Sequence, residues 1–284
     1  MSPGKVRFAV ATPDPAGWMH VRAFDEVAEA VEQGVLELGH PCERVVGALA
    51  PGRVNVLFGA HHLPPAAALP DSTVLFNLEQ IVTGSLWLTP AYLSRLRRHR
   101  VWDYSAQNVA ALRALGVTRA THVPLGYARS LERIARAEQD IDALFYGRLI
   151  PRRIELLKRL EARGLRVVAI NDAYGKERDA RIARARVVLN VHVADQARLE
   201  TARCFYALIN GCFVLSEESV DAAESGLAGG MAFAAYADLE ARCAWYLERP
   251  DERAAVAAAG RQLMRLRPQA ELLRPAIDEL LAAR

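Results

Sequence analysis

The chain has 284 residues, of which 52% are hydrophobic and 24% charged, and its formal net charge is +3. This composition is typical of a globular chain with about two domains and excludes a disordered one. The small net charge argues against a dedicated nucleic-acid-binding protein, which would carry a strong basic bias. The sequence has no apolar run of about 18 residues and no signal-peptide pattern, so we expect a cytoplasmic protein. Four cysteines without a C-x-x-C pair are expected to be free thiols.

Strand and helix patterns alternate in the first half of the chain. Apolar residues recur at three- and four-residue spacing from Trp18 to Leu38 and predict a helix that ends at Gly39. A second helix is expected over residues 106–115. Short apolar runs predict strands at residues 6–11, 54–58, 73–76, 101–104 and 120–123. Residues 128–140 are polar and charged, and are either a connector between two halves or an ordinary surface helix.

The second half shows the same alternation more clearly. Strands are expected at residues 143–146, 165–170, 187–191 and 212–215. Helices are expected near residues 154–160, 176–184, 199–209, 237–247, 251–266 and 269–283. Such a series predicts a parallel sheet with right-handed crossover helices on both faces, which is a Rossmann-like domain.

The first strand of the second half leads into a candidate phosphate site. It ends at Gly147 and Arg148, and Arg152 and Arg153 begin the next helix. Ligands of open α/β sheets bind at the carboxyl ends of the strands, where a glycine and a helix N-terminus admit an anion. Cations at a helix N-terminus oppose the helix dipole by ~0.3–1 kcal/mol each, so two in succession indicate an anion nearby. The alternative is that both arginines are solvated residues of the first helical turn.

Three polar residues lie at or after the carboxyl end of the third predicted strand of this half. The third strand of this half delivers Asn190 and then His192, and Glu200 lies at the start of the following helix. Glu200 is expected either to accept both hydroxyls of a nucleotide ribose or to serve only as a favourable helix charge. His192 either lies beside a reacting sugar, where its imidazole orients a hydroxyl or stabilises a leaving diphosphate, or has no role.

Polar residues of the first half have weaker assignments. Asn77 and Glu79 follow a predicted strand and either line an acceptor site or serve the structure alone. His61 and His62 lack cysteine or carboxylate companions at ligand spacing, so no metal site is expected there. The arginine-rich stretch 95–100 is either a solvated helix end or the site of a weak peripheral contact with an anionic membrane surface.

Residues 141–219 resemble the nucleotide-binding domain of group 1 GT-B glycosyltransferases, and the segments VWDYSAQN (101–108) and HVPLGY (122–127) are similar to their CgeB-like subgroup. The resemblance implies that Gly147, Arg148 and Arg153 hold the diphosphate of a donor. It also implies that Glu200, the second of two glutamates eight positions apart in the family, binds the ribose. His192 stands where the family has the first glutamate.

The resemblance further implies sugar or acceptor contacts in the first strand-to-helix loop, which contains Gly17 and His20. His20 is expected either to act as a base that deprotonates an acceptor hydroxyl or to be a helix N-terminal histidine without a function. The fold expected is α/β with two Rossmann-like domains facing a cleft (GT-B). The N-terminal, acceptor-side domain would span residues 1–130, the nucleotide-sugar domain residues 131–266, and residues 267–284 would form a helix that packs back on the N-terminal domain.

We therefore expect a hexosyltransferase-like glycosyltransferase. It would move a sugar from a nucleotide diphosphate sugar to a glycan, lipid, protein or small-molecule acceptor, with no cofactor and, as in the enzymes it resembles, without a bound metal. A nicotinamide dehydrogenase is disfavoured because no G-x-G-x-x-G follows a predicted strand. Two alternatives remain open at this point, which are a sugar-nucleotide epimerase on the same fold and a catalytically inactive binding or scaffold protein.

Overall fold

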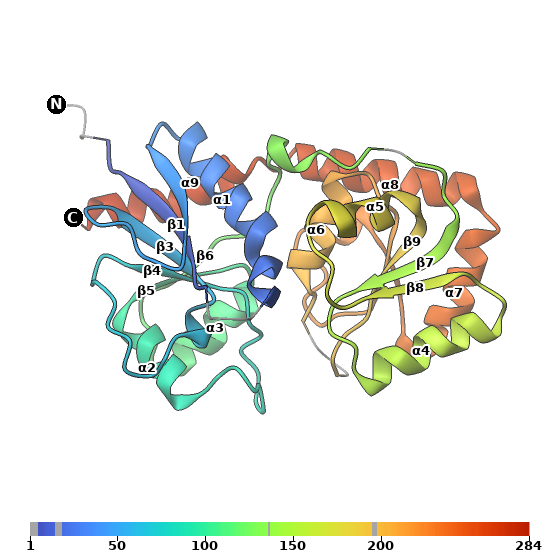
Figure 1. Cartoon of the computed structure of the whole chain (residues 1–284), viewed down its shortest axis with the longest axis horizontal. Coiled ribbons are helices and arrows are strands. Elements are labelled where there is room, and N and C mark those ends of the chain that lie inside the picture. Colours follow the sequence, from blue (N-terminus) through green and yellow to red (C-terminus); the bar gives the residue numbers. More distant parts are fainter. Residues whose placement is uncertain (1–4, 15–18, 136, 195–197, 284) are drawn as a thin grey trace. The chain divides into compact units, whose positions relative to one another are not determined.

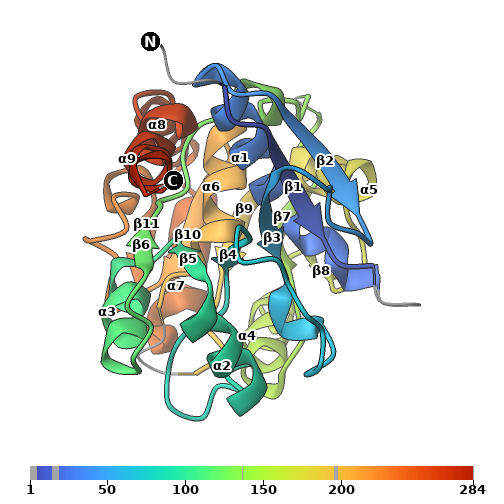
Figure 2. The same cartoon turned by 90° about the vertical axis from the view of Figure 1, so that its left-hand side faces the viewer.

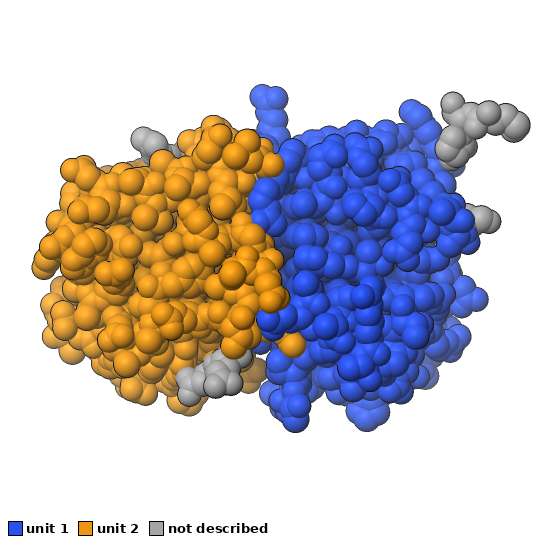
Figure 3. Space-filling view, turned by 180° about the vertical axis from the view of Figure 1, so that it is seen from behind, with its two compact units in different colours: residues 1–130, 267–284 blue, residues 131–266 orange. Residues whose placement is uncertain are grey.

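The computed structural model describes residues 5–14, 19–135, 137–194 and 198–283 (Figure 1). Its internal contacts divide the chain into two compact units. Unit 1 contains residues 1–130 and 267–284, and unit 2 contains residues 131–266 (Figure 3). Each unit is built on a parallel sheet, so the predicted mixed α/β class with two Rossmann-like sheets is confirmed.

Unit 1 contains a parallel sheet that has, in the described residues, the strand order β2-β1-β3-β4-β5-β6. The strands are β1 (Phe8–Thr12), β2 (Cys42–Val46), β3 (Val54–Phe58), β4 (Val74–Asn77), β5 (Arg100–Asp103) and β6 (Ala120–His122). The register of the sheet pairs Val10 with Arg44 on one side and with Val56 on the other. β1, β3 and β4 are buried along their whole length, because helices cover both faces of a parallel sheet.

Two pairs of helices cover the sheet of unit 1 (Figures 1 and 2). The helical segments are η1 (Met19–Phe24), α1 (Asp25–Glu37), η2 (Ala60–His62), α2 (Pro90–Arg98), α3 (Ala106–Ala114), η3 (Arg129–Leu131) and α9 (Gln269–Ala282). α1 and α9 lie together on one face, and α2 and α3 lie on the other (Figure 2). Gly34 makes the close approach of α9 feasible, because a Cβ there would lie 2.6 Å from Leu273 Cδ1.

Unit 2 contains a second parallel sheet, whose strand order in the described residues is β11-β10-β9-β7-β8. Its strands are β7 (Ile141–Tyr146), β8 (Val167–Ile170), β9 (Ala185–Asn190), β10 (Val214–Glu217) and β11 (Ala232–Ala234). Its helical segments are α4 (Pro151–Ala162), α5 (Lys176–Arg184), α6 (Thr201–Ile209), η4 (Ala228–Gly230), η5 (Tyr236–Asp238), α7 (Leu239–Leu247) and α8 (Pro250–Arg265). α4 and α7 cover one face and share a core with β7, β9 and β10, while α5, α6 and α8 lie on the other side (Figure 1).

Several elements differ from the sequence-based expectations. β2 and β11 were not predicted, because β2 is a half-exposed edge strand with Glu43 and Arg44 in it and β11 has only three residues. The first helix was expected from Trp18, but the described chain forms the 3-10 segment η1 before α1 begins at Asp25. All four cysteines are free, although only Cys204 and Cys243 are fully buried. None of the described helices has the length and apolar character needed to cross a membrane.

The segment 128–140 is a connector, and the alternative of a surface helix is wrong for its described residues. Beyond η3 it contains no regular element in those residues. The side chain of Asn210 at the end of α6 explains its path. Asn210 Oδ1 accepts hydrogen bonds from the backbone N–H groups of Arg133 and Ile134, both at 2.9 Å, and its Nδ2 donates to Leu131 O. These bonds satisfy backbone groups that a helix would otherwise pair internally.

The entry into α9 provides a test of the packing in unit 1. Tyr127 pairs with Pro268 in an isolated parallel bridge, and a Cβ on Gly126 would lie 2.5 Å from the backbone oxygen of Arg267. We expect Gly126→Ala to lower the free energy of unfolding by ~1–3 kcal/mol, because backbone atoms cannot yield cheaply to the new methyl group. Urea unfolding measured by circular dichroism checks this. Gly229→Ala is the control, since its Cβ would meet its nearest atom, Leu263 Cδ1, at 3.6 Å; equal losses in both variants would refute the packing argument.

Candidate functional site

Polar side chains converge at the carboxyl ends of β7, β9 and β10 in unit 2, which is where open parallel sheets bind ligands. Gly147 directly follows β7 with φ of 136°, a backbone conformation that favours glycine. A Cβ at this position would lie 2.6 Å from Arg203 Nη2. Any side chain here would therefore displace a guanidinium group, so the backbone of this turn stays open beside a positive charge.

Arg152 belongs to the first turn of α4 and forms a fork with Glu217 at the end of β10. Its Nη1 and Nη2 donate to Glu217 Oε2 and Oε1 at 2.6 and 2.5 Å. The guanidinium carbon also lies 3.7 Å from the ring centroid of Tyr236. The side chain is 17% exposed, so the alternative of a solvated first-turn residue is wrong for Arg152. Two N–H groups of its guanidinium are therefore already bonded to the carboxylate of Glu217.

Arg153 is still more deeply placed, with a side chain that is 3% exposed. Its Nε donates to Val191 O at 2.8 Å and its Nη1 to Arg148 O at 2.9 Å. Its Nη2 donates to Glu200 Oε1 at 3.0 Å. Arg153 therefore ties the glycine turn to β9 and α6, and the solvated alternative is wrong here too.

His192 is the central group of this cluster and its side chain is fully buried. Its Nδ1 donates to Glu200 Oε2 at 2.5 Å, its Nε2 lies 2.7 Å from Ser219 Oγ, and its backbone N–H donates to Glu217 Oε2 at 3.0 Å. Burial by itself would lower the pKa of His192, but the hydrogen bond to Glu200 and the charges of Glu200 and Glu217 outweigh burial and raise it. The imidazole thus has a carboxylate on one side and a hydroxyl on the other.

Glu200 is the N-cap residue of α6 and contacts two cationic groups. Burial by itself would raise its pKa, but the hydrogen bond from His192 and the charges of His192, Arg203 and Arg153 together lower it. Its carboxylate is therefore ionised at neutral pH. Each of its two oxygens accepts one bond within the cluster, so the predicted ribose contact would have to use the remaining lone pairs.

Arg203 and Asn190 form a second layer behind the glycine turn. Arg203 Nε donates to Tyr146 O at 2.8 Å, and its Nη1 donates to Asn190 Oδ1 at 2.5 Å. Asn190 is fully buried, and its Nδ2 donates to Ser216 Oγ at 3.0 Å. These bonds fix the guanidinium of Arg203 against the end of β7.

The cluster has more positive than negative side chains. Arg152, Arg153 and Arg203 face the two carboxylates of Glu200 and Glu217, which leaves a surplus of one positive charge before His192 is protonated. The exposed side chain of Arg148 adds another. A surplus of this sign at a helix N-terminus favours binding of an anion.

Sequence reasoning missed Arg203, Glu217 and Ser219. The predicted strand ended at residue 215, whereas β10 continues to Glu217, so neither Ser216 nor Glu217 was expected at the carboxyl edge. Strand pairing between Leu215 and Leu189 would have placed them there, but such pairing is not visible in a local pattern. Arg203 lies inside α6, and nothing in the local sequence distinguishes a ligand-binding arginine in a helix from a solvated one.

The remaining predicted site residues lie in unit 1 or outside the described structure. Asn77 is fully buried, where its Nδ2 donates to Asp103 Oδ2 at 2.6 Å and its Oδ1 accepts a bond from Tyr92 OH at 2.9 Å. Its amide therefore fixes the end of β4 through internal bonds. His20 lies in η1 with a partly buried side chain. Gly17 falls outside the described residues.

Glu79 is close to a histidine from the adjacent strand end. Its Oε1 lies 3.4 Å from His61 Nε2, and its side chain is 23% exposed. Burial raises the pKa of Glu79 to about 7. A carboxyl group that titrates near neutrality at the carboxyl edge of a sheet is a candidate for proton transfer.

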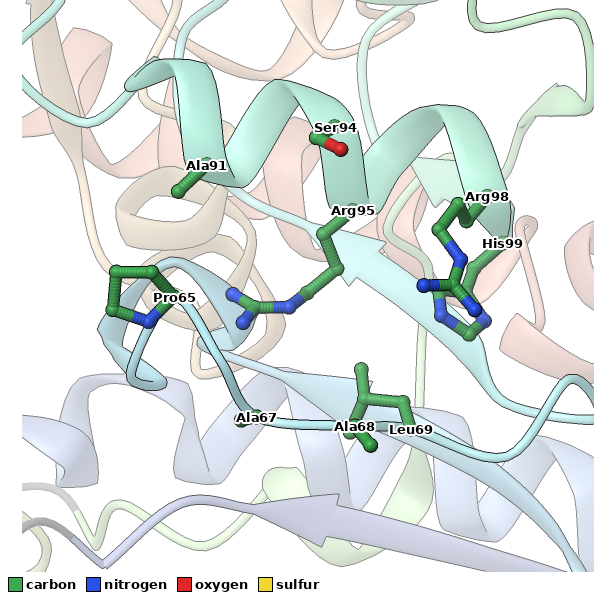
Figure 4. Close-up of a pocket in the computed structure, with 9 residues that line it drawn as sticks. All are labelled: Pro65, Ala67, Ala68, Leu69, Ala91, Ser94, Arg95, Arg98 and His99. Atoms are coloured by element: carbon green, nitrogen blue, oxygen red, sulfur yellow. The ribbon is translucent and has the colours of Figure 1, made fainter.

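A hollow of about 80 Å³ lies elsewhere on unit 1, between α2 and the loop that precedes β4 (Figure 4). Arg95 lines it with Arg98 and His99 from the same end of α2. Arg95 is buried and donates to the backbone oxygens of Ala60 and Pro64 at 2.8 and 2.7 Å. The prediction of a solvated helix end is therefore wrong for Arg95, which anchors a loop.

Acidic residues show no metal-binding arrangement in the part of the chain that the structure describes. The sequence Asp140-Ile141-Asp142 has the D-x-D form, but it lies at the amino end of β7, opposite to the cluster. Asp140 is paired with Arg184 at 2.6 Å and Asp142 with Arg186 at 2.6 Å. Both carboxylates therefore form ion pairs at the amino end of β7.

The pairing of His192 with Glu200 predicts a pH-dependent contribution to stability. The folded-state pKa of His192 is raised, so its contribution is present below its ordinary value of 6.5 and is lost as the pH rises through the folded pKa. We expect the difference in unfolding free energy between the wild type and His192→Gln to be largest near about pH 6 and to shrink toward about pH 9. Urea unfolding across this range measures it, and a difference that does not change with pH would contradict the pairing.

Comparison with known proteins identifies sequence relatives and solved structures that are similar to this chain. Two uncharacterised proteins of Acanthamoeba polyphaga mimivirus are 30% identical over 146 residues and 28% identical over 155 residues. These matches cover 51% and 52% of this chain and 50% and 49% of the relatives. The chain therefore spans about half the length of the curated relatives it matches.

Solved structures share the fold over nearly the whole chain. Anabaena HepE in complex with UDP-glucose matches with a TM-score of 0.60 at 12% identity, covering 97% of this chain and 100% of HepE. AviGT4, a glycosyltransferase involved in avilamycin A biosynthesis, matches with a TM-score of 0.57 at 16% identity, covering 97% and 98%. Sucrose-phosphate synthase from Thermosynechococcus elongatus matches with a TM-score of 0.60 at 13% identity, covering 99% and 100%. At these identities the likeness shows the fold alone, which is that of GT-B proteins.

The sequence profile of one family matches a continuous part of this chain. The match runs over residues 128–271, just over half of the chain, and includes every strand and helix that contributes to the cluster in unit 2. The chain belongs to the glycosyl transferase-like family.

Proposed function

We propose that the protein transfers a sugar from a nucleotide diphosphate sugar to a hydroxyl-bearing acceptor and that the donor binds at the carboxyl edge of the sheet in unit 2. Membership of the glycosyl transferase-like family supports sugar transfer. The crystal structure of HepE in complex with UDP-glucose supports a nucleotide sugar as the donor class. The observation that carries the proposal is the positively charged cluster around the open turn at Gly147.

The donor diphosphate is the group that this cluster suits best. The N-terminus of α4 presents backbone N–H groups and the positive end of the helix dipole, and its N-cap residue, Ile150, makes no side-chain cap hydrogen bond. The exposed Arg148 and the Nη2 of Arg203 flank the turn. Arg152 and Arg153 contribute charge at a distance, because their own donor groups are held by Glu217 and Glu200.

The ribose would bind through the remaining lone pairs of Glu200. An ionised carboxylate has about four lone-pair sites, and two are used by Arg153 and His192. The side chain is 17% exposed, which leaves part of it accessible to a ligand. In this assignment His192 and Arg153 set the orientation of the carboxylate.

His192 would stabilise the leaving diphosphate. Negative charge develops on the diphosphate as the bond to the sugar breaks, and fixed positive groups lower the energy of that state. The raised pKa of His192 favours the imidazolium form that can do this. Ser219, 2.7 Å from Nε2, is the neighbour through which a proton or a hydrogen bond would pass toward solvent.

The finer assignments rest on the resemblance and belong to the same proposal. They are the CgeB-like subgroup, the transfer of a hexose, catalysis without a bound metal, and Gly17 and His20 as contacts for acceptor or sugar. The weak peripheral contact of residues 95–100 with a membrane and the cytoplasmic location also remain proposals. The family match does not favour the epimerase or the inactive scaffold.

Arg148 provides the sharpest test of donor binding, since it is exposed and its guanidinium makes no hydrogen bond or ion pair with a described residue. We expect Arg148→Ala to weaken binding of a nucleoside diphosphate by roughly 10- to 100-fold, the loss of one charge-assisted hydrogen bond of about 1.5–3 kcal/mol. Isothermal titration calorimetry with UDP, GDP and ADP measures this. Arg181→Ala on α5 is the matched control, because Arg181 is exposed and, among the described residues, forms an ion pair with Glu177 of the same helix.

Two results of this experiment would overturn the proposal in different ways. A wild-type protein that binds none of the nucleoside diphosphates would remove the donor class. Tight binding that Arg148→Ala leaves unchanged would remove the glycine turn as the diphosphate site. Thermal shift with the same ligands gives an independent readout, since a ligand at about 100 times its dissociation constant adds roughly 2.7 kcal/mol to the stability.

A further inference from the structure

A buried histidine of unit 1 has a nitrogen with no hydrogen-bond partner among the described residues. His61 lies in η2, directly after β3, and its side chain is 4% exposed. Its Nε2 is buried and unpaired in that part of the structure, and the nearest carboxylate oxygen, Glu79 Oε1, lies 3.4 Å away. A buried polar group without a partner destabilises the folded state, so this arrangement calls for a reason.

The aromatic residues around His61 fix its ring in this place. Gly59 has φ of 63°, and a Cβ there would lie 2.6 Å from Phe24 Cε2, so the chain turns tightly into η2. The ring centroid of His61 lies 5.1 Å from that of Trp87, and the ring meets Tyr92 edge-on at 5.5 Å. These contacts hold Nε2 toward Glu79.

The pKa values of Glu79 and His61 are shifted in opposite directions from their ordinary values. Burial raises the pKa of Glu79 to about 7. Burial, followed by the nearby charge of His62, lowers the pKa of His61 to about 3. His61 is therefore neutral near pH 7, whereas Glu79 exchanges its proton there.

Other titratable groups lie around Glu79 and His61. His62 shares the turn with His61, and Tyr92 and Arg95 face it from α2. Asp103, at the end of β5, accepts a hydrogen bond from Asn77. Arg95, the cation in this set, donates to the backbone oxygens of Ala60 and Pro64.

We propose that Glu79, in place of His20, accepts the proton of the acceptor's hydroxyl group and that His61 is the positioning residue that holds its carboxylate. This inference rests on the proposed function, because it concerns the acceptor of that transfer. The side chain of Glu79 is 23% exposed, so an alcohol can reach it from solvent. The neutral ring of His61 donates from Nε2 once the carboxylate ionises, which gives the unpaired nitrogen its partner.

The proton balance of the step is simple. The O–H bond of the acceptor breaks, and its proton goes to Glu79. The electron pair left on the oxygen forms the new bond to the anomeric carbon of the sugar, while the bond from that carbon to the diphosphate breaks and its electron pair leaves with the diphosphate. A proton acceptor with a pKa near the working pH is best suited to this step.

Glu79→Gln tests the role of the carboxylate, since it keeps the shape and removes the base. We expect the rate of sugar transfer to glycerol and to methyl glucosides to fall by roughly 100-fold or more, the usual share of a general base. The affinity for the nucleotide should not change, because Glu79 is not among the residues proposed to bind the donor. Glu37→Gln on the exposed side of α1 is the control for loss of a carboxylate. Transfer at the wild-type rate by Glu79→Gln would overturn the proposal.

His61→Phe separates positioning from mere packing. It keeps an aromatic ring but removes the donor that stabilises the ionised carboxylate, so the rising limb of the pH–rate profile should move to higher pH. His61→Gln, which retains a donor, should restore part of the shift. A lower rate with an unmoved limb in both variants would show a packing role only and overturn the positioning of Glu79 by His61.

A measurement without turnover keeps the inference testable whatever the acceptor. The side-chain carboxyl carbon of Glu79, assigned by comparison with Glu79→Gln, is followed by NMR as the pH is raised. We expect it to titrate near 7, and titration near its ordinary value of 4.5 would overturn the proposal even if transfer is observed. A wild-type protein that binds no nucleotide sugar would instead overturn the proposed function, and the role of the pair in sugar transfer with it.

Discussion

The bonds between two carboxylates, two arginines and one imidazole organise the carboxyl edge of the second sheet. Glu217 joins Arg152 to the backbone of His192, and Glu200 joins Arg153 to the ring of His192. These contacts connect α4, α6, β9 and β10 across long stretches of sequence. Buried charges of this kind are stable only when each is paired, so the network depends on every member. The open turn at Gly147 takes its shape from this network.

The network also separates structural from ligand-binding charges. Arg152 and Arg153 use their donor groups within the protein, whereas Arg148 and one nitrogen of Arg203 lie at the glycine turn. The paired arginines still contribute positive potential, because two carboxylates do not balance the three guanidinium groups of Arg152, Arg153 and Arg203. Groups held rigidly in this way stabilise developing charge without having to reorganise. The arrangement explains why adjacent arginines at a helix N-terminus can be tolerated.

The sequence allowed much of the fold to be predicted, because strands buried on both faces read as apolar runs separated by helical patterns. β2 escaped detection since its edge position permits Glu43 and Arg44, and β11 is too short to form a pattern. Gly147, Arg153, His192 and Glu200 could be placed at strand and helix ends from local signals. Their pairing partners could not, because Glu217 and Ser219 reach the cluster only through strand pairing, and Glu79 reaches His61 only through the fold.

The central claim is that the turn at Gly147 receives the diphosphate of a sugar donor, and a crystal structure of the protein with a bound nucleotide sugar tests it most directly. The account predicts diphosphate oxygens within about 3 Å of the backbone N–H groups of the turn and of the guanidinium of Arg148. It also predicts the ribose hydroxyls at the carboxylate of Glu200. A diphosphate bound away from the carboxyl ends of β7 and β9, with the turn at Gly147 left to solvent, would contradict the account.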